Sequence, residues 1–180
     1  TFTDEGSERT EDALLAYGMD KYLTTSDPEW LAQLPMTKAV VRAMDTVQSF
    51  VDGMDGGLLN KPPSIEDFIV AGGSKRGWAT WLTAAVEAAK DGPSRVKAIL
   101  PISIDLLNMG KHFMRHWEAY GFYTPAIQDY AAFDLPCRSQ TPAGQSMLDI
   151  IDPYAYLDRL TMPKLVINSA GDQFFLPDSS

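Results

Sequence analysis

Three short apolar runs, set among segments with helical periodicity, most strongly constrain how this chain can fold. The apolar runs are 68–71, 96–102 and 164–170. The helical patterns cover 10–24, 35–52 and 75–90. Short continuous apolar runs rich in β-branched residues are typical of buried strands. Buried strands connected through helices predict the α/β class, with a parallel sheet covered by helices on both faces.

Individual residues refine this layout. Thr10 suits the N-cap of the first helix, and Pro35 suits the first turn of the second. A short helix is expected over 152–160, before the last strand. Between residues 105 and 142 the chain is rich in aromatic residues and helix breakers. We expect this part to be a mostly helical insertion. It is placed where it could form a lid or a substrate wall, but ordinary hydrophobic packing of its aromatic residues is the favoured alternative.

The composition limits the partners that the chain can bind. It has 180 residues, with 15 Lys plus Arg against 24 Asp plus Glu, and a net charge of -9. Such an acidic chain would repel nucleic acid and anionic membranes, so we expect a small-molecule or peptide substrate instead. The single cysteine, Cys137, excludes an internal disulfide framework. We expect no membrane association, no cofactor and no metal.

The clearest sign of chemistry is the segment Gly72–Gly77, which joins a predicted strand to a predicted helix. A sharp strand-to-helix turn of this type exposes a serine hydroxyl above the sheet. Ser74 is therefore the candidate nucleophile, and the amide of Lys75 the candidate oxyanion donor. The general pattern is G-x-S-x-G, but Arg76 stands here where the second glycine is usual, and Gly77 comes one place later. The alternative is a glycine-rich turn that binds an anion at the helix N-terminus.

Asp172 is the candidate acid of a catalytic triad. It follows the third predicted strand, at the edge where open α/β sheets build their sites, and it comes after Ser74 in the chain, as hydrolase triads require. Asp178 is a weaker rival, and Asp105, which follows the preceding strand, is another. A solvated turn is the alternative interpretation of any one of these aspartates.

The histidine of such a triad has no counterpart after Asp172. The two histidines, His112 and His116, both precede it, so a complete triad requires a histidine from beyond Ser180. Their spacing of four places them on one face of a helix, but the glutamate of the H-E-x-x-H zinc motif is absent. Packing within the insertion is the favoured role for this pair, with metal binding or a catalytic base as alternatives.

Five segments follow one another in the order seen in a known family. The elbow segment Gly72–Trp78 matches the signature G-x-S-K-R-G-W. The other four are Glu11–Tyr17, Leu34–Val47, Arg95–Asp105 and Gly171–Ser180. Over nearly its whole length, the chain therefore resembles the PhoPQ-activated pathogenicity-related protein family.

This resemblance implies an α/β-hydrolase-like fold with Ser74 as nucleophile and Asp172 as triad acid. It implies that residues 1–180 are part of such a domain, inactive alone, with the early strands and the histidine segment outside them. The offset glycine is also similar to glucuronoyl esterases, whose elbow reads G-x-S-R-x-G. There a basic side chain after the serine assists the oxyanion, which suggests the same role for the side chain of Lys75.

The functional expectation is a serine hydrolase of the esterase or peptidase type. The alternative is a non-catalytic binding or signalling protein on a hydrolase scaffold, because a fold does not fix a function and the family includes a signalling member. Many members of the family are exported, so the resemblance also implies a periplasmic or secreted protein.

Overall fold

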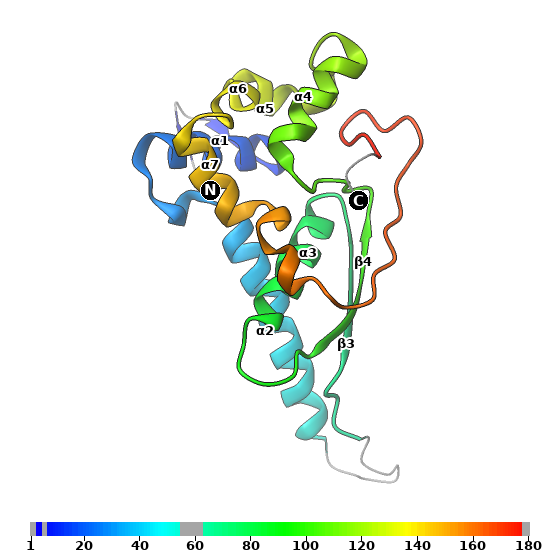
Figure 1. Cartoon of the computed structure of the whole chain (residues 1–180). Helices are drawn as coiled ribbons and strands as arrows, with labels where there is room; N and C mark the ends of the chain where they lie inside the picture. Colours follow the sequence, from blue (N-terminus) through cyan, green and yellow to red (C-terminus); the bar gives the residue numbers. More distant parts are fainter. Residues whose placement is uncertain (1–2, 5–6, 55–62, 178–180) are drawn as a thin grey trace.

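The fold places a small parallel sheet beside a group of helices (Figure 1). The computed structural model describes residues 3–4, 7–54 and 63–177. The helices and strands, in chain order, are β1 (Thr3–Asp4), β2 (Ser7–Glu8), α1 (Glu11–Thr25), η1 (Pro28–Trp30), α2 (Gln33–Asp52), β3 (Phe68–Gly73), α3 (Lys75–Ala88), β4 (Val96–Ile102), α4 (Met109–Tyr120), η2 (Pro125–Ile127), α5 (Gln128–Ala132), α6 (Leu135–Arg138), α7 (Pro142–Ile151) and η3 (Pro153–Arg159).

The strands β3 and β4 pair in parallel, as their apolar runs predict. Val70 lies opposite Ile99 and Gly73 opposite Ile102, so both strands end at the same edge of the sheet. The expected third strand at 164–170 is reduced to two parallel bridges, Ile99 with Lys164 and Ile102 with Ile167. In the described part of the chain this segment pairs with β4 alone, through backbone hydrogen bonds donated by the amides of Ile99, Leu165, Ile167 and Ser103.

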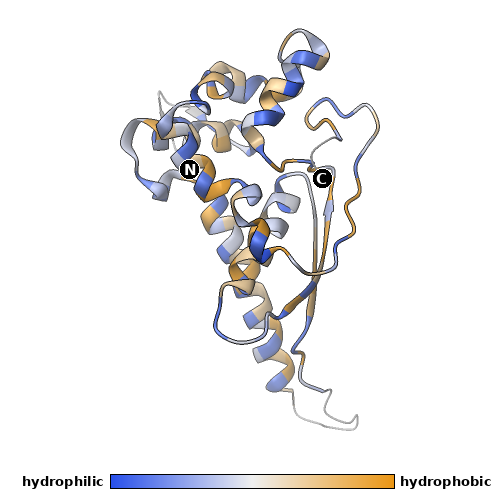
Figure 2. Cartoon of the chain, viewed as in Figure 1, coloured by the Kyte–Doolittle hydropathy of each residue, from blue (hydrophilic) through white to orange (hydrophobic). Residues whose placement is uncertain are grey.

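Helix α3 covers one face of the sheet and packs against both strands, and α2 packs against α3. Figure 2 shows hydrophobic and hydrophilic residues alternating along α2, as expected for a helix with one buried side. The core between these layers contains Val70, Trp81, Ala84 and Ile99. On the opposite face Ile69 remains 68% exposed, so among the described residues helices cover one face where the sequence predicted two.

Most helix boundaries agree with the sequence pattern to within two residues. Thr10 is the N-cap of α1, although its side chain makes no capping hydrogen bond. Helix α2 begins at Gln33, two residues before Pro35. The short helix expected over 152–160 is the 3₁₀ helix η3. The insertion is helical as predicted, with α4, η2, α5 and α6 inside 105–142.

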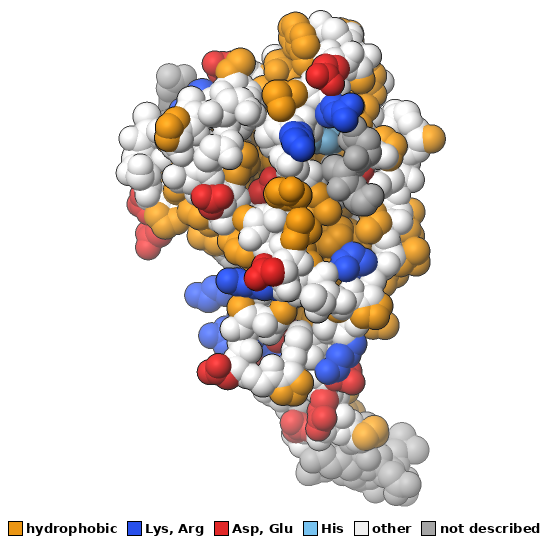
Figure 3. Space-filling model, viewed as in Figure 1, with side chains coloured by type: hydrophobic (Ala, Val, Ile, Leu, Met, Phe, Trp, Pro, Cys, Tyr) orange, Lys and Arg blue, Asp and Glu red, His pale blue; other side chains and the backbone are white. Residues whose placement is uncertain are grey.

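The helices of the insertion, together with α1 and α7, gather beyond the ends of β3 and β4 (Figure 1). Helix α1 contacts α5, α6 and α7, and α4 contacts α6. Hydrophobic side chains are exposed across the middle of the face seen in Figure 3. Among the helices of the described residues, none is long and apolar enough to span a bilayer.

An ion-pair cluster ties α2, α3 and β4 together at the other end of the sheet. The guanidinium of Arg95 donates to the buried Glu87 through Nε at 3.0 Å and Nη2 at 2.8 Å, and to Asp45 at 2.8 Å. Lys90 pairs with the same Glu87 carboxylate. The hydrogen bonds from Arg95 lower the pKa of Glu87 despite its burial. This cluster therefore fixes the position from which β4 starts.

Candidate functional site

Ser74 stands at a sharp backbone kink between β3 and α3. Its φ of 53° and ψ of -130° lie in a region that residues with a side chain rarely occupy. The Ser74 amide donates to the carbonyl of Ile102 at 2.9 Å, and the Ser74 carbonyl accepts from the Trp78 amide at 3.1 Å. The kink is thus held from both sides, by β4 and by the first turn of α3. Its geometry is the elbow that the sequence predicts.

Close packing requires two of the elbow glycines, Gly72 and Gly77. A Cβ on Gly77 would lie 2.4 Å from Cγ2 of Ile104 and 2.7 Å from the carbonyl oxygen of Gly72. A Cβ on Gly72 would lie 2.5 Å from the carbonyl oxygen of Arg76. Arg76, in contrast, is exposed. The chain therefore needs its second glycine at position 77, where the loop after β4 crosses α3, and tolerates a large residue at position 76.

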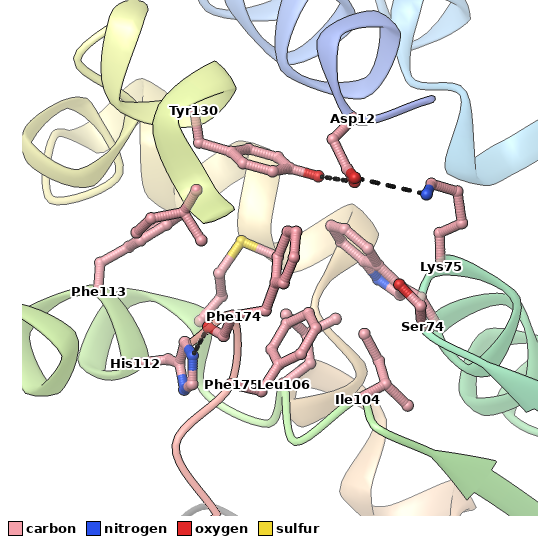
Figure 4. Close-up of a pocket in the computed structure, with 13 residues that line it drawn as sticks. Asp12, Ser74, Lys75, Ile104, Leu106, His112, Phe113, Tyr130, Phe174 and Phe175 are labelled. Atoms are coloured by element: carbon pink, nitrogen blue, oxygen red, sulfur yellow. Dashed lines mark hydrogen bonds and ion pairs between the residues drawn. The ribbon is translucent and has the colours of Figure 1, made fainter. Parts of the chain in front are cut away.

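A narrow cavity of about 30 Å³, called here the Ser74 pocket, opens beside the elbow. Figure 4 shows its side chains converging from α1, the elbow, the insertion and the segment after Asp172. Apart from Ser74 itself, its lining comprises Asp12, Lys75, Trp78, Ile104, Leu106, Met109, His112, Phe113, Ile127, Tyr130, Phe174 and Phe175. The walls are thus predominantly aliphatic and aromatic, with polar groups concentrated on the side of α1.

The polar side of the pocket is a chain of four interacting side chains. Lys75 Nζ lies 2.7 Å from a carboxylate oxygen of Glu11 and 3.4 Å from Oδ2 of Asp12. The hydroxyl of Tyr130 donates to the other oxygen of Asp12 at 3.0 Å (Figure 4). The start of α1 is thereby attached both to the elbow and to α5. The side chain of Lys75 is held by these carboxylates.

The ionisation of these groups follows from their partners. Partial burial disfavours the charged form of Lys75, but the hydrogen bond to Glu11 and the charges of Asp12 and Glu11 outweigh it, and its pKa is raised. Burial, together with the charge of Asp12, raises the pKa of Tyr130 well above its usual value. Lys75 therefore stays protonated at neutral pH and is unsuited to be the base for Ser74.

The two histidines occupy different surroundings on α4. His112 lines the Ser74 pocket, but Figure 4 shows Phe174, Phe175 and Leu106 between it and Ser74. The Nε2–H of His112 donates to the carbonyl of Phe174 at 3.1 Å. His116 is fully buried, and its Nε2 accepts from the Thr124 amide at 3.1 Å. Burial, and secondarily the charge of His112, lowers the pKa of His116.

These contacts favour packing and loop-holding roles for both histidines. No cluster of three His, Cys, Asp or Glu side chains that could hold a metal ion occurs in the described ranges. The hydrogen bond of His112 to the Phe174 carbonyl, and the apolar side chains between His112 and Ser74, also disfavour it as the catalytic base.

Asp172 organises the loop that closes the pocket. Its Oδ1 accepts from the amides of Phe174 at 2.7 Å and Phe175 at 3.1 Å. The hydroxyl of Tyr120 donates to the Asp172 carbonyl at 3.1 Å, and that of Thr124 to the Gln173 carbonyl at 2.8 Å. The insertion therefore holds this loop through side chains that bond to its backbone.

Asp172 itself is not among the residues that line the Ser74 pocket, although two residues of its loop are. Of the rival acids, Asp105 is 1% exposed and follows Ile104, which lines the pocket. Asp178 lies outside the described residues.

Sequence reasoning missed four residues of this site, namely Asp12, Tyr130, Phe174 and Phe175. The sequence places Asp12 in the first turn of a helix, where its charge suits the helix dipole. Its contact with Lys75 joins residues 63 positions apart, which no local pattern reveals. The two adjacent phenylalanines after Asp172 were the one available signal, because large apolar residues beside a candidate acid suggest a pocket wall.

Sequence comparison places the chain among known proteins. The sequence profile of the family described as PhoPQ-activated pathogenicity-related protein matches residues 1–180. The chain belongs to this family. The match confirms the resemblance carried by the elbow segment Gly72–Trp78 and its flanking segments.

One curated relative of the chain is autocrine proliferation repressor protein A of Dictyostelium discoideum. It is 42% identical over 179 residues, which cover 99% of this chain and 34% of the relative. The chain thus spans about a third of the length of that relative. No solved structure matches the chain significantly.

Proposed function

We propose that this PhoPQ-related protein is a serine hydrolase of the α/β-hydrolase type, with Ser74 as its nucleophile. The observation that carries the proposal is the strained backbone of Ser74 between a parallel strand and a helix, beside an apolar pocket. Non-glycine residues in such backbone regions cost about 1 to 3 kcal/mol and concentrate at functional sites. An elbow of this type presents its hydroxyl to a substrate instead of packing it.

In the proposed reaction the Ser74 oxygen attacks an ester or amide carbonyl and forms an acyl-enzyme. The hydroxyl proton passes to a base and then to the leaving group, and water releases the acyl group by the same route. The amide of Lys75 is the first of α3, where helix amides have no intrahelical acceptor, and it would bind the oxyanion. The Lys75 ammonium is held by Glu11 and Asp12 instead, which argues against the direct role for its side chain that the esterase likeness suggests.

Asp172 is the proposed acid of the triad. Among the described residues, both hydrogen bonds to its carboxylate go to Oδ1, which leaves Oδ2 for an imidazole. We assign that imidazole to a histidine outside residues 1–180, because His112 faces the Phe174 carbonyl. Residues 105–142 then serve as the wall of the pocket and as the support for the acid loop.

A second candidate function is a non-catalytic binding or signalling protein on the same scaffold. The name of the Dictyostelium discoideum relative favours it, since it describes a repressor of proliferation instead of a reaction. Both functions keep the elbow, but only the hydrolase needs the Ser74 hydroxyl.

The two functions are separated by ester hydrolysis in the intact protein. We expect Ser74→Ala to lower kcat for 4-nitrophenyl acetate by at least about 10³-fold. The matched control is Ser103→Ala, because Ser103 also has a positive φ, of 48°, and also follows a parallel strand. We expect the control to retain activity. Equal activity of wild type and Ser74→Ala would favour the binding protein.

The rival acids are separated by the same assay. Asp172→Asn is expected to lower kcat by about 10⁴-fold, the loss typical of a triad acid. Asp105→Asn serves as the comparison, and a larger loss there than at Asp172 would move the acid to the loop after β4.

A further inference from the structure

The size of the Ser74 pocket limits what can sit beside the nucleophile. Its volume is about 30 Å³. A cavity needs at least about 10 to 15 Å³ to hold one water molecule, so this pocket has room for about two groups of that size. The rings of Phe174 and Phe175 stack with centroids 6.0 Å apart and fill the side toward His112 (Figure 4).

The pocket walls limit the charge of an occupant as well. The aliphatic and aromatic side chains that dominate the lining offer no compensation for a buried charge. The charged lining residues among those described, Asp12 and Lys75, already form an ion pair. Asp12 also accepts from Tyr130, so this ion pair offers a charged ligand no unengaged partner of either sign.

A much larger cavity lies on the other side of Lys75. It has a volume of about 580 Å³ and lies between α1, η1, α2 and the first turn of α3. Glu11, Met36 and Arg76 are among its lining residues, and Ser74 is not. The paired side chains of Glu11 and Lys75 line this cavity, and Lys75 also lines the Ser74 pocket. Bulky substrate groups therefore have space near the elbow, but not in the Ser74 pocket.

We propose that the Ser74 pocket is an acyl pocket that admits acetyl and propionyl groups and excludes longer or charged acyl chains. This inference rests on the proposed hydrolase function and names its substrate class, the esters of short uncharged acids. During acylation the carbonyl carbon stays at the Ser74 oxygen, so the pocket has to hold only the methyl or ethyl group. A butyryl chain would have to displace the ring of Phe175 or the side chain of Met109.

The test is a series of 4-nitrophenyl esters, because acetate, propionate, butyrate and octanoate share one leaving group. Pockets that differ by one methylene discriminate by about 10- to 200-fold. We expect kcat/KM of the intact protein to fall at least about tenfold from propionate to butyrate. A ratio near one, or faster hydrolysis of octanoate than of acetate, would overturn the acyl-pocket inference and leave the hydrolase in place. Absence of hydrolysis for every ester would overturn both.

Two methionine substitutions provide a matched pair. Met109 lines the Ser74 pocket and Met36 lines the larger cavity. We expect Met109→Ala to raise the butyrate-to-acetate ratio of kcat/KM by at least about tenfold, and Met36→Ala to leave it within about twofold. Because Met109 is buried at the start of α4, Phe175→Ala provides a second enlargement on a loop, with the same expected shift. An unchanged ratio in folded variants of both pocket residues would contradict the proposal.

Discussion

Replacing Ser74 with glycine is expected to stabilise the protein relative to replacing it with alanine. Any residue with a Cβ is strained at a φ of 53° and a ψ of -130°, by about 1 to 3 kcal/mol, whereas glycine adopts this conformation freely. Glycine also loses more chain entropy on folding, which costs roughly 0.5 to 1 kcal/mol. The balance predicts that Ser74→Gly has a free energy of unfolding about 1 kcal/mol higher than that of Ser74→Ala.

Thr10 supplies the control for this comparison. Like Ser74 it is the N-cap of a helix, and like Ser74 it makes no side-chain capping bond. Its backbone is ordinary extended chain, with φ at -129° and ψ at 164°. The difference between Thr10→Gly and Thr10→Ala therefore contains the capping preference and the entropy cost, but no relief of strain.

Urea unfolding followed by tryptophan fluorescence measures both differences, because Trp78 and Trp81 are buried in the core. We expect the gain of glycine over alanine at position 74 to exceed that at position 10 by at least about 1 kcal/mol. Equal gains at the two positions would refute the argument, because they would mean that Ser74 is unstrained.

Four further outcomes are expected. Arg95→Met should lower the free energy of unfolding at pH 7 by about 3 kcal/mol, because it leaves the buried Glu87 paired with Lys90 alone. The control is Arg42→Met, which should lower it by under about 0.5 kcal/mol because the Arg42 side chain is exposed. The folded-state pKa of Glu87 is lowered, so its pairing with Arg95 contributes to the free energy of unfolding above the unfolded pKa of about 4.3. In urea titrations the difference in free energy of unfolding between wild type and Arg95→Met should therefore shrink as the pH falls through the lower folded pKa. The pKa of His116, measured by NMR, should lie below 6.5 because the imidazole is buried. The contribution of His116 to the free energy of unfolding is therefore complete above pH 6.5 and is lost as the pH falls. A measured pKa above 6.5 would contradict its burial. Gly77→Ala should lower the free energy of unfolding by roughly 2 kcal/mol despite the better helix propensity of alanine, because its Cβ would overlap Ile104; unchanged stability would refute this packing.

Features that depend on short stretches of chain were predictable from sequence. The segment 68–77 contains the strand, the elbow and the start of α3 within a few positions, and the structure confirms their order. The parallel pairing of β3 and β4 also follows, since a helix between two strands leaves little alternative. The offset glycine at position 77 was visible, but its reason, contact with Ile104, was not.

Features that depend on distant residues were not predictable. The segment 164–170 has a strand-like sequence, but regular pairing requires neighbours that the segment itself does not encode. The carboxylate of Asp12 reaches Lys75 only because α1 packs beside the elbow. Likewise, the loop after Asp172 is held by Tyr120 and Thr124, about 50 residues earlier in the chain.

The most direct test of Ser74 as an activated nucleophile is covalent labelling. The intact protein is treated with an alkyl fluorophosphonate, which forms a stable adduct only with a serine activated by its surroundings. Mass spectrometry of the digested protein should find the adduct on the peptide that contains Ser74, and Ser74→Ala should carry none there. An intact protein that remains unlabelled at Ser74, in a reaction where a known serine hydrolase is labelled completely, would contradict the account.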